Sequence, residues 1–172
     1  MLAKLKKAFV LLIIGVISGG SIYLVNELTW ELIRDNQIKL EEKQYSVIFE
    51  NGVSFEASVL EGDITKKVEV YDESLNLLGY IFKGTRVNNY GRITVLVGIN
   101  ANNEIEQVVI ASTTNTPNNV QIIKSKYIMN FDGQSVNSEI NYDAKTGATY
   151  TYASIQEVIE DSITYYLNEG GE

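Results

Sequence analysis

Residues 92–112 read RITVLVGINANNEIEQVVIAS. Residues 93–99 are rich in β-branched side chains, which favour β-strands. Residues 100–103 supply turn-forming asparagines, and residues 104–110 then form a second strand-like run. The stretch therefore predicts an antiparallel hairpin from Arg92 to about Ser112.

Two more strands are predicted before this hairpin and two helices after it. Residues 67–71 alternate polar and apolar side chains, and residues 77–82 form a short apolar run around Gly79. After Pro117, apolar residues at spacings of three to four predict a short amphipathic helix that ends near Asp132. A longer C-terminal helix is predicted from an apolar stripe formed by Ile155, Val158, Ile159, Ile163, Tyr166 and Leu167. This order predicts an α+β domain with antiparallel strands and flanking helices rather than a doubly wound parallel sheet.

An uncharged apolar run lies near the N-terminus. Residues 8–25 read AFVLLIIGVISGGSIYLV, about 27 Å of helix, which is close to the thickness of a bilayer core. Three lysines precede the run and acidic residues follow it, so the N-terminus is expected in the cytoplasm. A cleaved signal peptide is the alternative, but residues 21–27 contain no Ala-x-Ala-like site. We therefore predict a single-pass anchor in the cell membrane, with the remaining chain extracytoplasmic.

Three segments follow from this pattern. Residues 1–25 are the cytoplasmic tip and transmembrane anchor. Residues 26–44 remain compatible with a helix and are interpreted as a helical stalk. Residues 45–172 contain no repeat or low-complexity tract and are predicted to form one domain.

Composition excludes several classes of function. The chain has no cysteine and no histidine, which rules out a thiolate nucleophile, a Ser-His-Asp triad and Cys/His metal sites. After the apolar run, 22 acidic residues stand against 11 basic ones, a formal charge of −11. A domain with this much negative charge is repelled by phosphate backbones, so nucleic acid is not an expected partner. We predict no catalytic side chain and no metal site.

Residues 143–151, DAKTGATYT, stand directly before the predicted C-terminal helix. Gly147 permits a tight turn, and Ala148 leaves the approach to the helix unobstructed. The start of a helix offers unpaired N–H groups and a positive dipole, both of which favour a phosphate. Thr149 places a hydroxyl at this position. The alternative is that Thr149 or Thr151 only caps the helix.

The same segment resembles the attachment sequence of a known family. Asp143, Thr146, Gly147, Ala148 and Thr149 match the Asp-x-x-Ser/Thr-Gly-Ala-Thr pattern of FMN-binding domains that carry flavin on threonine. Residues 78–82 and 89–99 are also similar to signatures of this family, which is typified by the G subunit of the Rnf complex and the C subunit of sodium-pumping NADH:quinone reductase. The resemblance implies that a flavin transferase joins FMN to Thr149 as a phosphoester, with the other four residues as its recognition sequence.

One loop departs from the family pattern. Where the family has Glu-Thr-Pro-Gly-Leu-Gly, residues 115–120 read NTPNNV, so Thr116 and Pro117 are retained but the carboxylate and both glycines are not. Asparagine tolerates positive φ better than most residues and is expected to replace glycine in this backbone. The resemblance makes Thr116 a candidate flavin contact, and Tyr80 and Tyr90 weaker candidates.

The resemblance also implies a role. We expect a membrane-anchored electron-transfer subunit of an Rnf-type ion-translocating ferredoxin:NAD oxidoreductase, with other membrane subunits as partners. It would be a redox subunit of a translocase rather than a complete enzyme. A stand-alone extracytoplasmic flavoprotein that receives electrons from a quinone pathway is the first alternative. A non-redox binding domain that has lost its flavin is the second.

Overall fold

A computed structural model describes residues 2–142 and 148–170. The chain divides into two compact units, Met1–Glu41 and Glu42–Glu172. Helix α1 spans Leu2–Ile48 without a break, so its last turns belong to the second unit.

The first unit consists of the apolar part of α1 and the polar turns that follow it. Its large apolar side chains are exposed, from 40% for Ile13 to 74% for Leu5. Among the described residues, α1 is the one helix long and apolar enough to cross a membrane.

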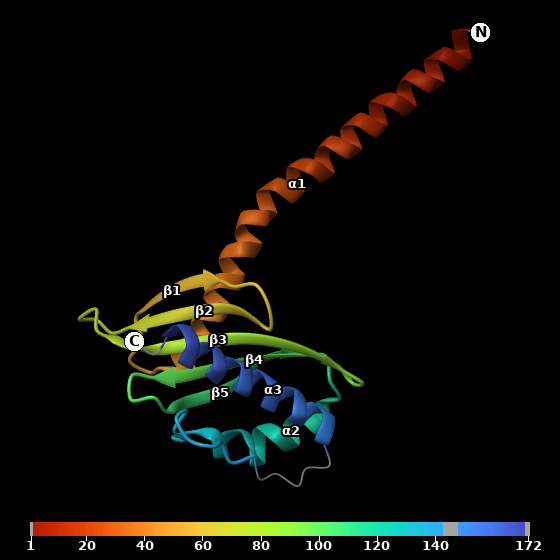
Figure 1. The fold of residues 1–172 in the computed structure, drawn as a ribbon. Helices are drawn as coiled ribbons and strands as arrows, with labels where there is room; N and C mark the ends of the chain where they lie inside the picture. The colour runs from red at the N-terminus through yellow and green to blue at the C-terminus, as the bar shows by residue number, and fades with distance from the viewer. Residues whose placement is uncertain (1, 143–147, 171–172) are drawn as a thin grey trace. The chain divides into compact units, whose positions relative to one another are not determined.

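The second unit is built on an antiparallel five-stranded sheet in which the strands follow one another in sequence order, as Figure 1 shows. The strands are β1 (Ser54–Val59), β2 (Ile64–Tyr71), β3 (Leu77–Asn88), β4 (Gly91–Asn100) and β5 (Ile105–Thr113). The predicted hairpin is confirmed as β4 and β5, with Val97 opposite Val108. Asn103 in its turn has φ of 62°, a conformation that asparagine tolerates. β1 was not predicted, because its residues are mostly exposed and show no clear alternation.

Helices follow the sheet, as predicted, but with different ends. They are α2 (Pro117–Lys126), a short 3₁₀ helix η1 (Ile128–Phe131), α3 (Thr149–Tyr165) and a π-helical turn η2 (Tyr166–Gly170). The amphipathic helix after Pro117 was expected to continue toward Asp132. It stops at Lys126, and Tyr127 is the capping residue between α2 and the 3₁₀ helix. Leu167 was assigned to the apolar stripe of the last helix but lies in the π-helical turn and is 48% exposed.

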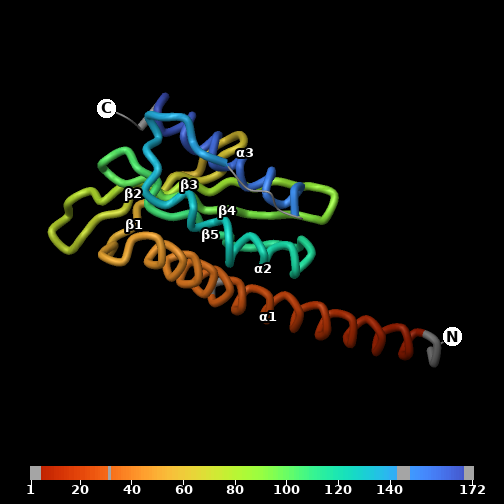
Figure 2. The backbone as a smooth tube through the Cα atoms, turned by 90° about the horizontal axis from the view of Figure 1, so that it is seen from below, coloured from red at the N-terminus to blue at the C-terminus, as the bar shows by residue number. Residues whose placement is uncertain are grey.

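Both faces of the sheet are covered. In β4, all residues from Ile93 to Ile99 are buried, and successive side chains point to opposite faces. Val95 and Val97 belong to a cluster that includes Ile155 and Ile159 of α3. Leu96 belongs to a second cluster with Tyr45, Ile48 and Phe49, at the end of α1 and just beyond it. Figure 2 shows α3 and the last turns of α1 on opposite sides of the sheet. The α+β fold with antiparallel strands is therefore confirmed.

Two glycines allow the helices to approach the strands closely. A Cβ atom on Gly84 of β3 would stand 2.6 Å from Cγ1 of Val158 in α3. On the other face, a Cβ atom on Gly98 of β4 would stand 2.3 Å from Cγ2 of Ile48 in α1. Both distances are far below van der Waals contact, so each helix rests where a side chain is missing.

Candidate functional site

The predicted acceptor, Thr149, is the first residue of α3 and is exposed. Ala148 occupies the N-cap position, and its carbonyl accepts the first helical hydrogen bond from Tyr152 N–H, at 3.0 Å. Ala148 is 1% exposed and belongs to the core cluster beneath α3. Ala148 therefore ties the start of the helix to the core. The exposed Thr149 hydroxyl lies where the helix dipole favours an anion.

The remaining residues of the attachment pattern are not part of this geometry. Asp143, Thr146 and Gly147 lie outside the described residues. Their predicted role in recognition by a flavin transferase stays a prediction.

The structure also addresses the capping alternative. Ala148 holds the N-cap position of α3, and its methyl side chain makes no capping hydrogen bond. Thr151 Oγ1 instead donates a hydrogen bond of 2.9 Å to Asn115 Oδ1, and Thr151 is completely buried. Capping is therefore not the function of Thr151, and Thr149 follows the capping position rather than filling it.

Asn115 connects the loop between β5 and α2 to two other segments. It is 3% exposed. Its side chain accepts from Thr151 in α3, and its Nδ2 donates to the carbonyl of Arg92 in β4, at 3.2 Å. Its own backbone N–H donates to Thr113 Oγ1 at 3.0 Å. This loop, β4 and the first turn of α3 are thereby joined through one amide side chain.

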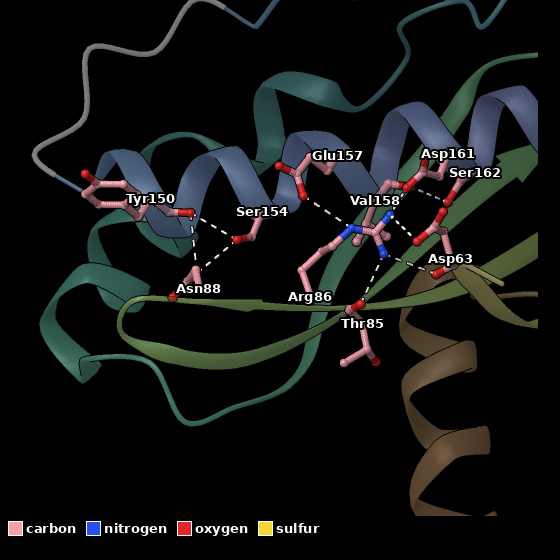
Figure 3. A network of polar contacts seen from close by, with 10 residues as sticks. All are labelled: Asp63, Thr85, Arg86, Asn88, Tyr150, Ser154, Glu157, Val158, Asp161 and Ser162. Carbon is pink, nitrogen blue, oxygen red and sulfur yellow. Dashed lines mark hydrogen bonds and ion pairs between the residues drawn. The ribbon is translucent and has the colours of Figure 1, made fainter.

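The turn between β3 and β4 also contacts the beginning of α3, as Figure 3 shows. Asn88 Nδ2 donates to Ser154 Oγ at 2.9 Å and to the Tyr150 carbonyl at 3.4 Å. Its Oδ1 accepts from the backbone N–H of Tyr90 at 2.9 Å. Gly91 in this turn has φ of 131°, and a Cβ atom there would stand 2.5 Å from Thr114 Oγ1. Only glycine fits this combination of backbone angle and close approach.

Two exposed tyrosines lie beside the acceptor. The rings of Tyr90 and Tyr150 meet edge to face, with centroids 5.9 Å apart, and the residues are 45% and 55% exposed. The structure therefore brings the candidate Tyr90 next to the residue that follows Thr149. Tyr80 lies elsewhere: its ring contacts Tyr166, beyond the far end of α3, at 5.8 Å.

Thr116 is exposed and immediately precedes α2. Its carbonyl accepts hydrogen bonds from the backbone N–H groups of Asn119 and Val120, at 3.0 and 3.2 Å. The expectation of positive φ in this loop is wrong. Asn118 and Asn119 are helical, because Pro117 presets the backbone for the first helical position. Thr116 remains a candidate contact, since Asn115 connects its loop to α3.

A single arginine holds the middle of α3 against β3. The guanidinium of Arg86 contacts Glu157 at 3.3 Å and Asp63 at 3.4 Å, and it also forms an ion pair with Asp161 (Figure 3). Its Nη1 also donates to the Thr85 carbonyl at 3.1 Å. Arg86 is thus surrounded by carboxylates and orients the helix that carries Thr149.

Sequence reasoning missed the residues that support the acceptor. Asn115 was noted only as a departure from the family pattern, and neither Asn88 nor Tyr150 was considered. The contacts of Asn115 and Asn88 with α3 join residues 36 and 66 positions apart. No local spacing indicates such pairs.

The comparison with known families agrees with this geometry. Residues 89–164 match the family model described as an FMN-binding domain. The match begins in the turn between β3 and β4 and extends through β5, α2 and nearly all of α3. The match therefore covers most of the segments that meet at the start of α3. It supports the interpretation that the chain contains an FMN-binding domain and binds flavin. No curated protein matches the chain.

Proposed function

We propose that this chain is a membrane-anchored electron-transfer subunit that carries FMN on Thr149 through a phosphoester bond. One observation carries the proposal. The last threonine of the attachment pattern is exposed at the first position of a helix, inside the region that matches an FMN-binding domain.

The residues around Thr149 suit a tethered flavin phosphate. The start of α3 favours negative charge, because helix N–H groups and the helix dipole point toward it. Tyr90 and Tyr150 offer exposed aromatic surface next to the acceptor. Ala148, Asn115 and Asn88 hold this turn, so the tether would start from a fixed point.

Attachment requires an activated flavin phosphate. With a flavin dinucleotide as donor, the Thr149 hydroxyl oxygen forms a bond to the flavin-side phosphorus while the pyrophosphate bond breaks. A nucleoside monophosphate leaves, and the hydroxyl proton is released. No base for this step is assigned to the chain, which fits the expectation that a separate flavin transferase performs it.

The bound flavin would supply the redox chemistry, and the chain would supply position and charge. Acidic residues outnumber basic ones beyond the apolar run, so the flavin would lie on a negatively charged domain. A side-chain nucleophile is not needed for electron transfer, in keeping with a chain that has no cysteine and no histidine.

The apolar part of α1 supports membrane anchoring. Under the positive-inside rule, the lysines that precede it hold the N-terminus in the cytoplasm and the flavin domain outside. With the attachment pattern, this arrangement supports a subunit of an Rnf-type ion-translocating ferredoxin:NAD oxidoreductase. Its partners would be the other membrane subunits of that complex and a flavin transferase.

Attachment is tested by coexpression with a flavin transferase, followed by mass spectrometry of the peptide that contains Thr149. The wild type should carry one FMN at Thr149, and Thr149→Ala should carry none. Thr164→Ala is the matched control, because Thr164 is another exposed threonine of the same helix. Its labelling should equal that of the wild type. An unmodified Thr149 peptide, or equal labelling of Thr149→Ala, contradicts the attachment.

Sidedness is tested with single cysteines, since the natural chain has none. Ser74→Cys lies in the exposed turn between β2 and β3, and Lys6→Cys precedes the apolar run. A membrane-impermeant maleimide should label Ser74→Cys in intact cells, and Lys6→Cys only after permeabilisation. The reverse pattern contradicts the proposed orientation.

Complex membership is tested by mild detergent extraction of native membranes and affinity purification of the chain. Copurification of integral-membrane redox subunits with ferredoxin:NAD oxidoreductase activity supports the Rnf-type assignment. Recovery of the flavinylated chain alone, reducible by quinol in the membrane, supports the stand-alone carrier instead.

A further inference from the structure

We propose that Asn115 is a positioning residue for flavin attachment. Its buried hydrogen bond with Thr151 holds the first turn of α3 in the rotation that the packed remainder of the helix imposes, and so presents the Thr149 hydroxyl to the flavin donor. This inference rests on the proposed attachment at Thr149.

The bond between Asn115 and Thr151 is enclosed. Thr151 is 0% exposed and Asn115 is 3% exposed, and the two side chains are joined at 2.9 Å. Asn115 also donates from Nδ2 to the Arg92 carbonyl at 3.2 Å. An amide accepts on one side and donates on the other, which is what these two partners require. A carboxylate would accept from Thr151 but would repel the Arg92 carbonyl. The asparagine that departs from the family pattern is therefore matched to its surroundings in this chain.

The spacing of the two threonines connects this bond to the acceptor. An α-helix turns about 100° per residue, so side chains two positions apart point about 200° apart around its axis. When Thr151 is turned inward toward Asn115, Thr149 must face outward. The observed exposure agrees, because Thr149 is exposed and Thr151 is buried. The same bond also withholds the Thr151 hydroxyl from modification.

Other contacts also hold the first turn of α3, but none of those described below involves Thr151. Asn88 binds the Tyr150 carbonyl and Ser154 from the turn between β3 and β4. Ala148 anchors the end of the helix through its buried methyl group. Loss of the Asn115–Thr151 bond should therefore loosen the first turn while the rest of α3 stays packed.

The experiment compares three variants of helix α3 in the full chain. Thr151→Val keeps the shape of the side chain and removes the hydroxyl, and Thr151→Ser keeps the hydroxyl. Ser162→Ala is the matched control, because Ser162 is also completely buried and donates at 2.6 Å to the Val158 carbonyl near the other end of the helix. Each folded variant is incubated with purified flavin transferase and flavin dinucleotide, and the rate of labelling at Thr149 is measured. Amide hydrogen exchange of the first turn of α3 is measured on the same samples.

We expect Thr151→Val to be labelled about tenfold more slowly than the wild type, as loss of a buried hydrogen bond suggests. Amide exchange should be faster at residues 152–155, whose N–H groups bond to carbonyls of the first turn. Thr151→Ser should restore both values, and Ser162→Ala should leave both near those of the wild type despite its own loss of stability. Asn115→Ala removes the bond to Thr151 and also the bond to the Arg92 carbonyl, so it should slow labelling at least as much as Thr151→Val. The double variant should be labelled no more slowly than Asn115→Ala, because the bond between the two residues is already lost there.

Two results overturn the inference. The first is that Thr151→Val has the same labelling rate and the same amide exchange as the wild type. The second is an equal slowing in Ser162→Ala, which would show that only overall stability matters. If the wild type itself is not labelled, the proposed function fails. Hydrogen exchange in Thr151→Val against Ser162→Ala then still decides whether Asn115 holds the first turn.

Discussion

Gly84 of β3 lies directly beneath Val158 of α3, so closely that a Cβ atom at Gly84 would stand 2.6 Å from Val158 Cγ1. The helix that carries Thr149 therefore rests on the sheet at a point where a side chain is absent. We expect Gly84→Ala to reduce the free energy of unfolding by about 1–3 kcal/mol through overpacking. Urea denaturation measures this change. In a Val158→Ala background the same substitution should cost clearly less, and an equal cost there would contradict direct contact.

Arg86 is the shared partner of Glu157, Asp161 and Asp63, and its side chain is only 16% exposed. Arg86→Met should destabilise the domain by about 1–2 kcal/mol, because the carboxylates lose their partner while remaining partly solvated. Raising the salt concentration should shrink this loss, since salt screens the repulsion that remains. Denaturation midpoints at low and high salt test the prediction.

Arg86→Lys separates charge from geometry. Lysine keeps the positive charge but lacks the forked donor arrangement, so it should recover only part of the lost stability. Lys124→Met, at an exposed position of α2, is the control for removing one positive charge. If Lys124→Met costs as much as Arg86→Met, net charge rather than the contacts of Arg86 explains the effect.

The titration of Asp132 should make the free energy of unfolding depend on pH. Desolvation by the surrounding protein, and secondarily the charge of Glu106, raise the pKa of Asp132 to about 6. A raised pKa means that the folded state favours the protonated carboxyl. The stability that Asp132 contributes is therefore fully present below about pH 4 and is lost as the pH rises through 6. The residue as a whole is exposed, and we therefore expect a small effect.

Asp132→Asn removes this titration. Relative to the wild type, the variant should be more stable at pH 7 than at pH 4, and thermal unfolding at the two values measures the difference. Glu106→Gln should lower the pKa of Asp132 and reduce the same pH dependence. An unchanged difference between Asp132→Asn and the wild type across this range would contradict the pKa shift.

Asn88 links the turn between β3 and β4 to α3 through Ser154 and the Tyr150 carbonyl. Asn88→Ala should lower the free energy of unfolding by about 1 kcal/mol, the usual net value of such hydrogen bonds. Ser154→Ala should be less harmful in the Asn88→Ala background than in the wild type, because the two share a bond. Additive losses in urea denaturation would show that the bond does not contribute.

The amino-acid sequence alone was enough to predict the apolar helix near the N-terminus, the β4–β5 hairpin and the helix that begins at Thr149. Each of these elements is indicated by residues close together in the chain: a run of apolar residues, an alternation of apolar and polar residues, or apolar residues at helical spacing. The attachment pattern is equally local, so Thr149 could be proposed as the acceptor before its surroundings were known. The edge strand β1 escaped prediction because most of its side chains stay in solvent and so carry little pattern.

Only the tertiary structure decided how that threonine is held. Asn115 and Thr151 are 36 residues apart, and Arg86 and Asp161 are 75 apart. Contacts over such separations depend on the order of the strands and on the rotation of α3, which are set by burial over the whole domain. Local spacing therefore placed the hydroxyl at the start of a helix, whereas packing between distant segments turned it outward, because only one side of that helix can be buried against the sheet.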